Sequence, residues 1–255
     1  PGIFEYQFMP GRDTARHRHL ARLILDYKVA YRSAVGAADV RFPATRVITV
    51  DRTIHAGNTI HTYDQVASYI DKYASIGVGT CYCRHAARLR GEDTHGLPME
   101  VCLWFGAGAD FAVERLGGRR LNRAEAREVL DRCEAAGLLH MSRNTAADID
   151  FLCNCDRWHC EVVGEMLRQP RPGRVFNSGY EPRFDPDRCA ACGTCVERCP
   201  AGALTLADGA VPRVDLDRCF GCAVCATGCP QEAVAMAAKP GWPAPPSTTR
   251  DLAAA

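Results

Sequence analysis

The sequence lacks any apolar run long enough to cross a membrane, which takes about 20 consecutive residues. It also lacks an excess of either charge, because 31 Lys and Arg offset 30 Asp and Glu and leave a net charge of +1. A balanced charge argues neither for nor against nucleic acid or an acidic partner. The basic side of the helical segment 12–35 is more typical of a solvated helix face than of a nucleic-acid-binding helix. We therefore expect no membrane span, and we do not expect nucleic acid as a partner of this chain.

Catalytic motifs are missing as well. The glycine-rich stretch GAGADF, residues 106–111, fits neither a P-loop nor a dinucleotide-binding fingerprint. No acid–base pair or nucleophile triad stands out elsewhere in the chain. These absences favour a non-catalytic protein, and they leave open an enzyme whose chemistry resides in a metal centre.

Cysteine, by contrast, is abundant. The chain has 15 cysteines, an odd number, so they cannot all pair in disulfides within the chain. Disulfide scaffolds are also found mainly in small secreted domains that lack a sufficient core. A chain of this length with repeated CxxC pairs is more typical of a metal protein in a reducing compartment. We therefore expect a cytoplasmic metal-binding protein.

Eight of the cysteines form a repeat. The segments CAACGTCVERCP, residues 189–200, and CFGCAVCATGCP, residues 219–230, share the pattern C-x2-C-x2-C-x3-C-P. The flanks PRFDPDRC and PRVDLDRC also match, at the same offset of 30 residues, so the segment is an internal duplication. Zinc is the alternative for such CxxC pairs, but a zinc site takes two pairs of ligands and leaves the third cysteine and the proline unexplained.

Residues 180–238 resemble the bacterial-type two-[4Fe–4S], or dicluster, ferredoxins. The resemblance implies one-electron transfer at low potential, with each [4Fe–4S] cluster held by three cysteines of one repeat and the last cysteine of the other. It thus implies two ligand sets, which are Cys189, Cys192, Cys195 and Cys229 for one cluster, and Cys219, Cys222, Cys225 and Cys199 for the other.

Seven cysteines remain outside the repeat. Cys133 stands alone in a helical pattern, where a buried, inert thiol is the usual case. The other six fall in three short segments, CYC, EVC and CNCDRWHC, and they are Cys81, Cys83, Cys102, Cys153, Cys155 and Cys160. Two of these segments contain C-x-C pairs, which in an extended chain would direct both thiols to one side. We take the six as candidate metal ligands.

Three interpretations of these six thiols compete. The first is a third [4Fe–4S] cluster held by four of them, with Cys83, Cys102, Cys155 and Cys160 as the favoured set. The second is a structural zinc ion, for which the adjacent His85 and His159 are further possible ligands. The third is a group of buried or redox-active free thiols, beside which Arg84 would stabilise a thiolate.

Most of the chain also resembles a little-characterised group of cysteine-rich bacterial 4Fe–4S proteins that end in a two-cluster ferredoxin domain. The matching stretches are PGIFEYQFM, CYCRH, MEVCLWFGAGADF and the CNC segment. Asp156, Trp158 and His159 occupy positions that can be cysteine in that group, which argues against a large or double cluster. Similar proteins tend to carry a winged-helix-like segment upstream of PGIFEYQFM, and since residue 1 is Pro rather than Met, we expect further sequence before it.

The hydrophobic patterns predict an α+β protein. A mixed domain over residues 1–178 would carry the third metal site, the ferredoxin domain would span 179–238, and 239–255 would be an extended or disordered tail. Predicted helices cover 12–35, 63–74 with Thr62 as N-cap, and 123–137, and another begins at 106–108. Predicted strands cover 46–50, a short segment around Cys102, and 138–141.

These observations predict an iron–sulfur electron-transfer protein, or a non-catalytic subunit of an oxidoreductase complex, that relays single electrons to or from a redox partner. Two alternatives stay open. One is an iron–sulfur redox sensor or regulator, and the other is an iron–sulfur enzyme with an open site in the N-terminal domain.

Overall fold

The computed structural model describes residues 5–35, 44–54, 65–207 and 209–254. Its helices are η1 (Glu5–Phe8), α1 (Ala15–Val35), η2 (Asp51–Thr53), α2 (Val66–Lys72), α3 (Tyr82–Arg90), α4 (Ala107–Arg115), α5 (Arg123–Ala135), α6 (Glu161–Leu167), α7 (Pro172–Val175), α8 (Thr194–Arg198), α9 (Val224–Thr227) and α10 (Thr249–Ala254). Its strands are β1 (Thr45–Ile48), β2 (Ile76–Thr80), β3 (Glu100–Phe105), β4 (Arg119–Leu121), β5 (Leu139–Arg143), β6 (Phe151–Cys155), β7 (Tyr180–Phe184), β8 (Leu204–Thr205), β9 (Arg213–Val214) and β10 (Val234–Ala238).

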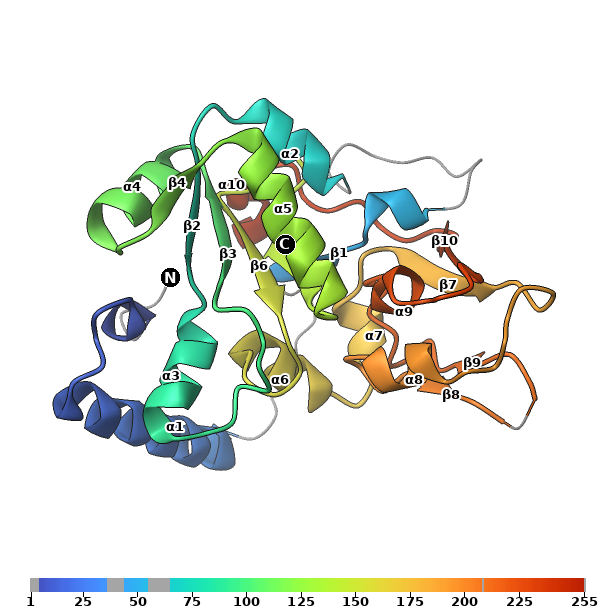
Figure 1. The fold of residues 1–255 in the computed structure, drawn as a ribbon, viewed down its shortest axis with the longest axis horizontal. Helices are drawn as coiled ribbons and strands as arrows, with labels where there is room; N and C mark the ends of the chain where they lie inside the picture. The colour runs from blue at the N-terminus through green and yellow to red at the C-terminus, as the bar shows by residue number, and fades with distance from the viewer. Residues whose placement is uncertain (1–4, 36–43, 55–64, 208, 255) are drawn as a thin grey trace.

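The N-terminal part is built on a six-stranded sheet. Its strands run in the order β1-β5-β6-β3-β2-β4, and every neighbouring pair is antiparallel. Figure 1 shows this sheet with helices packed around it and the repeat elements β7 to β10 gathered at the other end of the molecule. The predicted α+β class is therefore confirmed.

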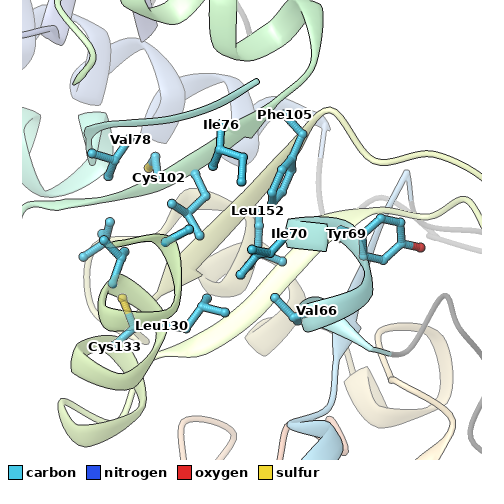
Figure 2. Packing of buried hydrophobic residues seen from close by; sticks show 14 of the residues in the cluster. Val66, Tyr69, Ile70, Ile76, Val78, Cys102, Phe105, Leu130, Cys133 and Leu152 are labelled. Atoms are coloured by element: carbon cyan, nitrogen blue, oxygen red, sulfur yellow. The ribbon is translucent and has the colours of Figure 1, made fainter. Parts of the chain in front are cut away.

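Helices α2 and α5 cover one face of the sheet. Helix α5 begins with a capping box, in which the Asn122 side chain accepts from the Glu125 N–H at 3.0 Å and the Glu125 carboxylate accepts from the Asn122 N–H at 2.8 Å. Its buried residues recur at helical spacing, and they are Ala126, Val129, Leu130 and Cys133. Figure 2 shows this stripe meeting α2 and the strands β2, β3 and β6.

Helix α4 lies against the opposite side of β2. A Cβ atom at Gly77 would stand 3.3 Å from Val113, and one at Gly108 would stand 2.9 Å from the carbonyl oxygen of Asp150. These glycines therefore allow α4 to approach the sheet closely. This close approach lies just before the CYC segment.

The CYC segment differs from the prediction. Strand β2 ends at Thr80, Cys81 is the N-cap residue of α3, and Cys83 lies within that helix. The expectation of extended chain holds for Cys81 but is wrong for Cys83, because the backbone turns into a helix directly after the first cysteine. Cys153 and Cys155, in contrast, lie in strand β6 as expected.

The other elements follow the sequence patterns closely. Helix α1, strands β1, β3 and β5, and helices α4 and α5 lie within two or three residues of their predicted bounds. Thr62 lies outside the described residues, and the N-cap of α2 is Gln65, which makes no side-chain capping bond. No helix among the described residues is long and apolar enough to cross a membrane.

The tail contains structure. Helix α10 lies within the segment expected to be extended or disordered. Just before it, the carbonyl oxygens of Pro246 and Ser247 accept from the N–H groups of Ala146 and Ala147 at 2.8 and 3.1 Å. These backbone bonds attach the tail to the loop between β5 and β6, which is a long-range contact that local periodicity does not reveal.

Candidate metal centres

The two cysteine loops of the repeat fold in the same way. The N–H groups of Cys189 and Cys219 donate to the carbonyl oxygens of Asp185 and Asp215 at 3.0 and 2.9 Å. Each of these aspartates also turns the chain, since its carboxylate accepts from the N–H two residues on, at 3.0 and 2.9 Å. The sequence duplication is therefore also a structural duplication.

A matching pair of contacts surrounds the last cysteine of each repeat. The N–H of Ala203 donates to the Cys199 sulfur, and the N–H of Ala233 donates to the Cys229 sulfur, both at 3.3 Å. N–H donors stabilise a sulfur that carries negative charge. The two repeats thus provide equivalent surroundings for a thiolate.

Each loop also contains two residues with positive φ. Gly193 (79°) corresponds to Ala223 (65°), and Ala191 (50°) corresponds to Gly221 (67°). An alanine at positive φ is strained, and such strain concentrates at functional sites. Gly221 has a steric role too, because a Cβ there would lie 2.4 Å from the Tyr180 carbonyl oxygen.

The folded repeat brings the eight cysteines together in two groups of four. One cavity, with about 330 Å³ of empty space including its mouth, is lined by Cys189, Cys192, Cys195 and Cys229. A second cavity of the same size is lined by Cys199, Cys219, Cys222 and Cys225. Each group has three cysteines of one loop and the last cysteine of the other loop, which is the grouping implied by the resemblance.

The two cavities differ in exposure. Cys192 in the first cavity is exposed, and Cys189 and Cys229 are half-buried, whereas all four cysteines of the second cavity are buried. A hydrogen bond with Thr194 lowers the pKa of the exposed Cys192. Burial raises the pKa of Cys219 to about 11 and that of Cys222 further. Burial therefore disfavours the thiolate form of these two cysteines.

The six remaining candidate cysteines form a closed ring, which we call the six-thiol ring. Each thiol interacts with two others, in the order Cys81, Cys83, Cys160, Cys155, Cys153, Cys102 and back to Cys81. Five of the six are buried and Cys153 is half-buried. Three segments that are far apart in the sequence thus contribute to one site.

The contacts within the six-thiol ring shift the pKa values alternately. Interactions with neighbouring thiols lower the pKa of Cys81 and Cys160, and lower that of Cys153 to about 6. They raise the pKa of Cys83, Cys102 and Cys155 well above the usual range. The six thiols are therefore coupled, and their protons belong to the ring as a whole rather than to single residues.

A buried ion pair adjoins the six-thiol ring. Arg84 donates to the Asp156 carboxylate at 2.7 Å and to the Asn154 carbonyl oxygen at 3.4 and 3.3 Å, and its side chain is 0% exposed. Burial opposes its charge, but the negative charge of Cys81 and Asp156 more than offsets this and raises the pKa of Arg84. A fixed cation beside six thiols favours their anionic forms.

Asp156 also organises the loop that carries Cys160. Its carboxylate accepts from the N–H groups of Trp158 and His159 at 2.8 and 2.6 Å, and it contacts His159 Nδ1 at 3.0 Å. The other ring nitrogen, His159 Nε2, lies 3.0 Å from the Asp93 carbonyl oxygen. Both nitrogens of His159 thus have protein partners, so the structure does not support the sequence-based suggestion that His159 is a metal ligand.

The other histidine, His85, and the isolated cysteine, Cys133, lie in different surroundings. His85 Nδ1 lies 2.8 Å from the Phe8 carbonyl oxygen, so this ring nitrogen faces the N-terminal helix η1. Cys133 is 0% exposed, and burial raises its pKa to about 12. A thiolate at Cys81 contributes to this raised pKa, so Cys133 lies close enough to the six-thiol ring to interact with it electrostatically.

Among the described residues, no group of three or more Cys, His, Asp or Glu side chains has the spacing that holds one metal ion. Thiolates around an iron–sulfur cluster would surround several atoms rather than one, so they need not lie as close together as the ligands of a single ion.

Apolar packing connects the six-thiol ring to the second cavity. Cys155 and Cys160 belong to the same buried cluster as Cys199, Cys219 and Phe220. The Arg157 guanidinium, in the CNC segment, donates to the Cys199 carbonyl oxygen at 3.3 Å. One continuous cluster of buried apolar side chains therefore joins the two cavities and the six-thiol ring.

Sequence reasoning had named all six cysteines of the ring and the eight of the repeat, but it had not assigned a structural role to Asp156 or Arg157. A signal for Asp156 was present, because each C-x-C pair is followed by a charged residue of opposite sign, as CYCR and CNCD. The contact between Arg157 and the repeat has no such signal, since it depends on how the two parts pack.

Comparison with known families supports an iron–sulfur domain in the repeat. Residues 182–205 match the family model of the 4Fe-4S binding domain. The chain therefore carries an iron–sulfur domain of the ferredoxin type that binds at least one 4Fe-4S cluster. Comparison with curated proteins gives no match to this chain.

Proposed function

We propose that this protein is an electron-transfer protein, or a subunit of an oxidoreductase complex, with two [4Fe–4S] clusters in the repeat and a third cluster at the six-thiol ring. One observation carries the proposal. The ring cysteines Cys155 and Cys160 pack in the same buried cluster as the cysteines of the second cavity. Electron carriers that act in series must lie close together, as this shared packing places them, whereas a separate structural metal site would not need to lie beside the second cavity.

The residues of both cavities fit a four-iron cluster. Each cavity supplies four cysteines, one for each iron, and apolar side chains line most of the remaining wall. When bound, such clusters supply one-electron transfer. Phe220 and Met236, which are 1% and 0% exposed, exclude water from the second cavity. Water exclusion and N–H donors to sulfur are the protein features that tune a cluster potential.

The six-thiol ring has two thiols more than one [4Fe–4S] cluster requires. We retain Cys83, Cys102, Cys155 and Cys160 as the proposed ligands, because they include residues from all three segments. Cys81 and Cys153 would then remain as neighbours that donate to or accept from the ligand sulfurs. Arg84 would offset the negative charge that four thiolates bring into a buried site.

The exposure of the cysteines suggests which cavity a redox partner would approach first. Cys192 of the first cavity is exposed, so we propose that a redox partner protein docks over this cavity. The buried second cavity then stands between the partner and the six-thiol ring. The structure has no disulfide among the fifteen cysteines. A cytoplasmic location, where thiols stay reduced, is part of the proposal.

Reductive titration of the anaerobically purified full chain tests the proposal. We expect an uptake of about three electrons per chain, one for each four-iron cluster. The Cys155→Ser variant should take up about two, because the change removes a ligand of the third cluster only. The Cys133→Ala variant is the matched control and should still take up about three.

An uptake of about two electrons by the unmodified chain would contradict the third cluster and leave the repeat clusters in place. An uptake near one would contradict the dicluster assignment as well. Electron paramagnetic resonance of the same samples assigns the lost signal to the repeat or to the ring.

A further inference from the structure

A cleft lies beside the six-thiol ring, between α1, α3 and α6. It has about 730 Å³ of empty space including its mouth. Two ring residues, Cys83 and Cys160, form part of its wall, together with Phe8, Ile24, Leu25 and Trp158. Cys83 and Cys160 interact with each other within the ring, so the cleft leads from solvent to one edge of the ring.

A glycine keeps this cleft open. Gly164 lies in the middle of α6 and lines the cleft. Its φ is not positive, and a Cβ atom there would meet nothing within 4 Å, so neither the backbone nor the packing requires glycine. Glycine is an unfavourable residue inside a helix. Open space at this position is therefore the feature that the glycine preserves.

The charges around the cleft are unequal. Four cations line it, and they are Lys28, Arg32, Arg90 and Arg168. Lys28 pairs with Glu161 and Arg90 with Glu92, whereas Arg32 and Arg168 share the single carboxylate of Glu165. Counted over the described residues, one positive charge is thus in excess at the end of the cleft formed by α1 and α6.

We propose that this cleft binds a small organic anion, a carboxylate on a compact apolar or aromatic body, beside Cys83 and Cys160. Arg32 and Arg168 would bind the carboxylate with a bidentate or forked geometry. Phe8, Ile24 and Trp158 would contact the apolar body. The cleft itself is independent of what the ring holds, but its position beside a redox centre rests on the proposed function.

Fluorine NMR of the full, anaerobically purified chain with 4-fluorobenzoate as the probe tests this proposal. We expect the probe to bind at millimolar concentration and to bind at least about tenfold more tightly than the neutral 4-fluorobenzamide, because the excess charge favours the anion. The Gly164→Leu variant should abolish binding by filling the cleft, whereas Gly164→Ala, the matched control, should retain it. Arg168→Gln should weaken binding, and Arg171→Gln, which does not line the cleft, should leave it unchanged.

The same experiment separates the cleft from the third cluster. If the probe binds and chemical reduction of the protein broadens its fluorine signal, and Gly164→Leu removes both effects, the cleft and the adjacent redox centre are both supported. If the probe binds but reduction leaves its signal unchanged, the cleft is supported and the proposed third cluster is not. If 4-fluorobenzoate does not bind, or if it binds the Gly164→Leu variant as tightly as the unmodified chain, the inference is overturned whatever the metal content.

Discussion

At the scale of single residues, the Arg84–Asp156 pair makes the clearest prediction. Both side chains are almost fully buried, and removing one partner of a buried pair leaves an uncompensated charge. We expect Arg84→Met to lower the free energy of unfolding by about 3–5 kcal/mol. Denaturant unfolding of the anaerobic protein, followed by circular dichroism, measures this change.

A matched control is Arg127→Met, which removes a half-exposed ion pair with Asp71. Such a pair contributes about 0–1 kcal/mol, so this variant should unfold close to the unmodified protein. Equal effects of the two changes would show that Arg84 has no special role in the site.

A change at Gly164 is expected to raise the free energy of unfolding rather than lower it. Since a Cβ there would have open space and the backbone is helical, Gly164→Ala should stabilise the protein by about 0.4–1 kcal/mol. The same unfolding measurement applies. A loss of stability would mean that the glycine is required by packing, and it would remove the argument that it keeps the cleft open.

At the scale of elements, the contact between α8 and the end of α5 joins the two parts of the molecule. Arg198 donates to the carbonyl oxygens of Glu134 and Ala135 at 2.7 and 3.2 Å. A cation at a helix C-terminus satisfies free carbonyls and interacts favourably with the helix dipole. Arg198→Gln should therefore lower the free energy of unfolding by about 1.5–3 kcal/mol.

Gly228 supplies an independent test of this contact. A Cβ atom at position 228 would lie 2.0 Å from Arg198 Nε, so Gly228→Ala must displace the guanidinium. The Gly228→Ala and Arg198→Gln variants should destabilise the protein by similar amounts, and the double variant should cost little more than either. Additive effects in the double variant would contradict a shared mechanism.

The elements differ in how far the sequence predicts them. Helix α5 was predictable because its capping box and apolar spacing are local, and the repeat loops were predictable because their spacing is duplicated. The turn from β2 into α3 at Cys81 was not, because a C-x-C pair is compatible with strand or helix. The order of the strands and the attachment of the tail depend on long-range pairing, which local patterns do not encode.

At the scale of the whole molecule, the centres differ in their access to solvent. Because Cys192 is exposed and the cysteines of the second cavity are buried, the cluster of the first cavity should be lost first on mild oxidation with a chelator. About four irons should leave in the first phase. Alkylation and mass spectrometry should then label Cys189, Cys192, Cys195 and Cys229, while early labelling of Cys219 or Cys222 would contradict this order.

The candidate site was predictable in composition but not in arrangement. The six remaining cysteines could be identified by subtraction, since eight belong to the repeat and Cys133 is isolated. Their closure into one ring, and its contact with the second cavity through Arg157 and Cys199, arise from the packing of strands and loops that are far apart in sequence. The cleft depends on the position of α1, so no sequence motif predicts it.

The content of iron, acid-labile sulfide and zinc per anaerobically purified chain tests the central claim most directly. The account predicts about twelve irons and about twelve sulfides without zinc, from three four-iron clusters. Cys155→Ser should reduce both to about eight, and Cys133→Ala should leave them unchanged. About eight irons with one zinc, or about eight irons alone, would contradict the third cluster and leave the six-thiol ring as a structural or thiol site.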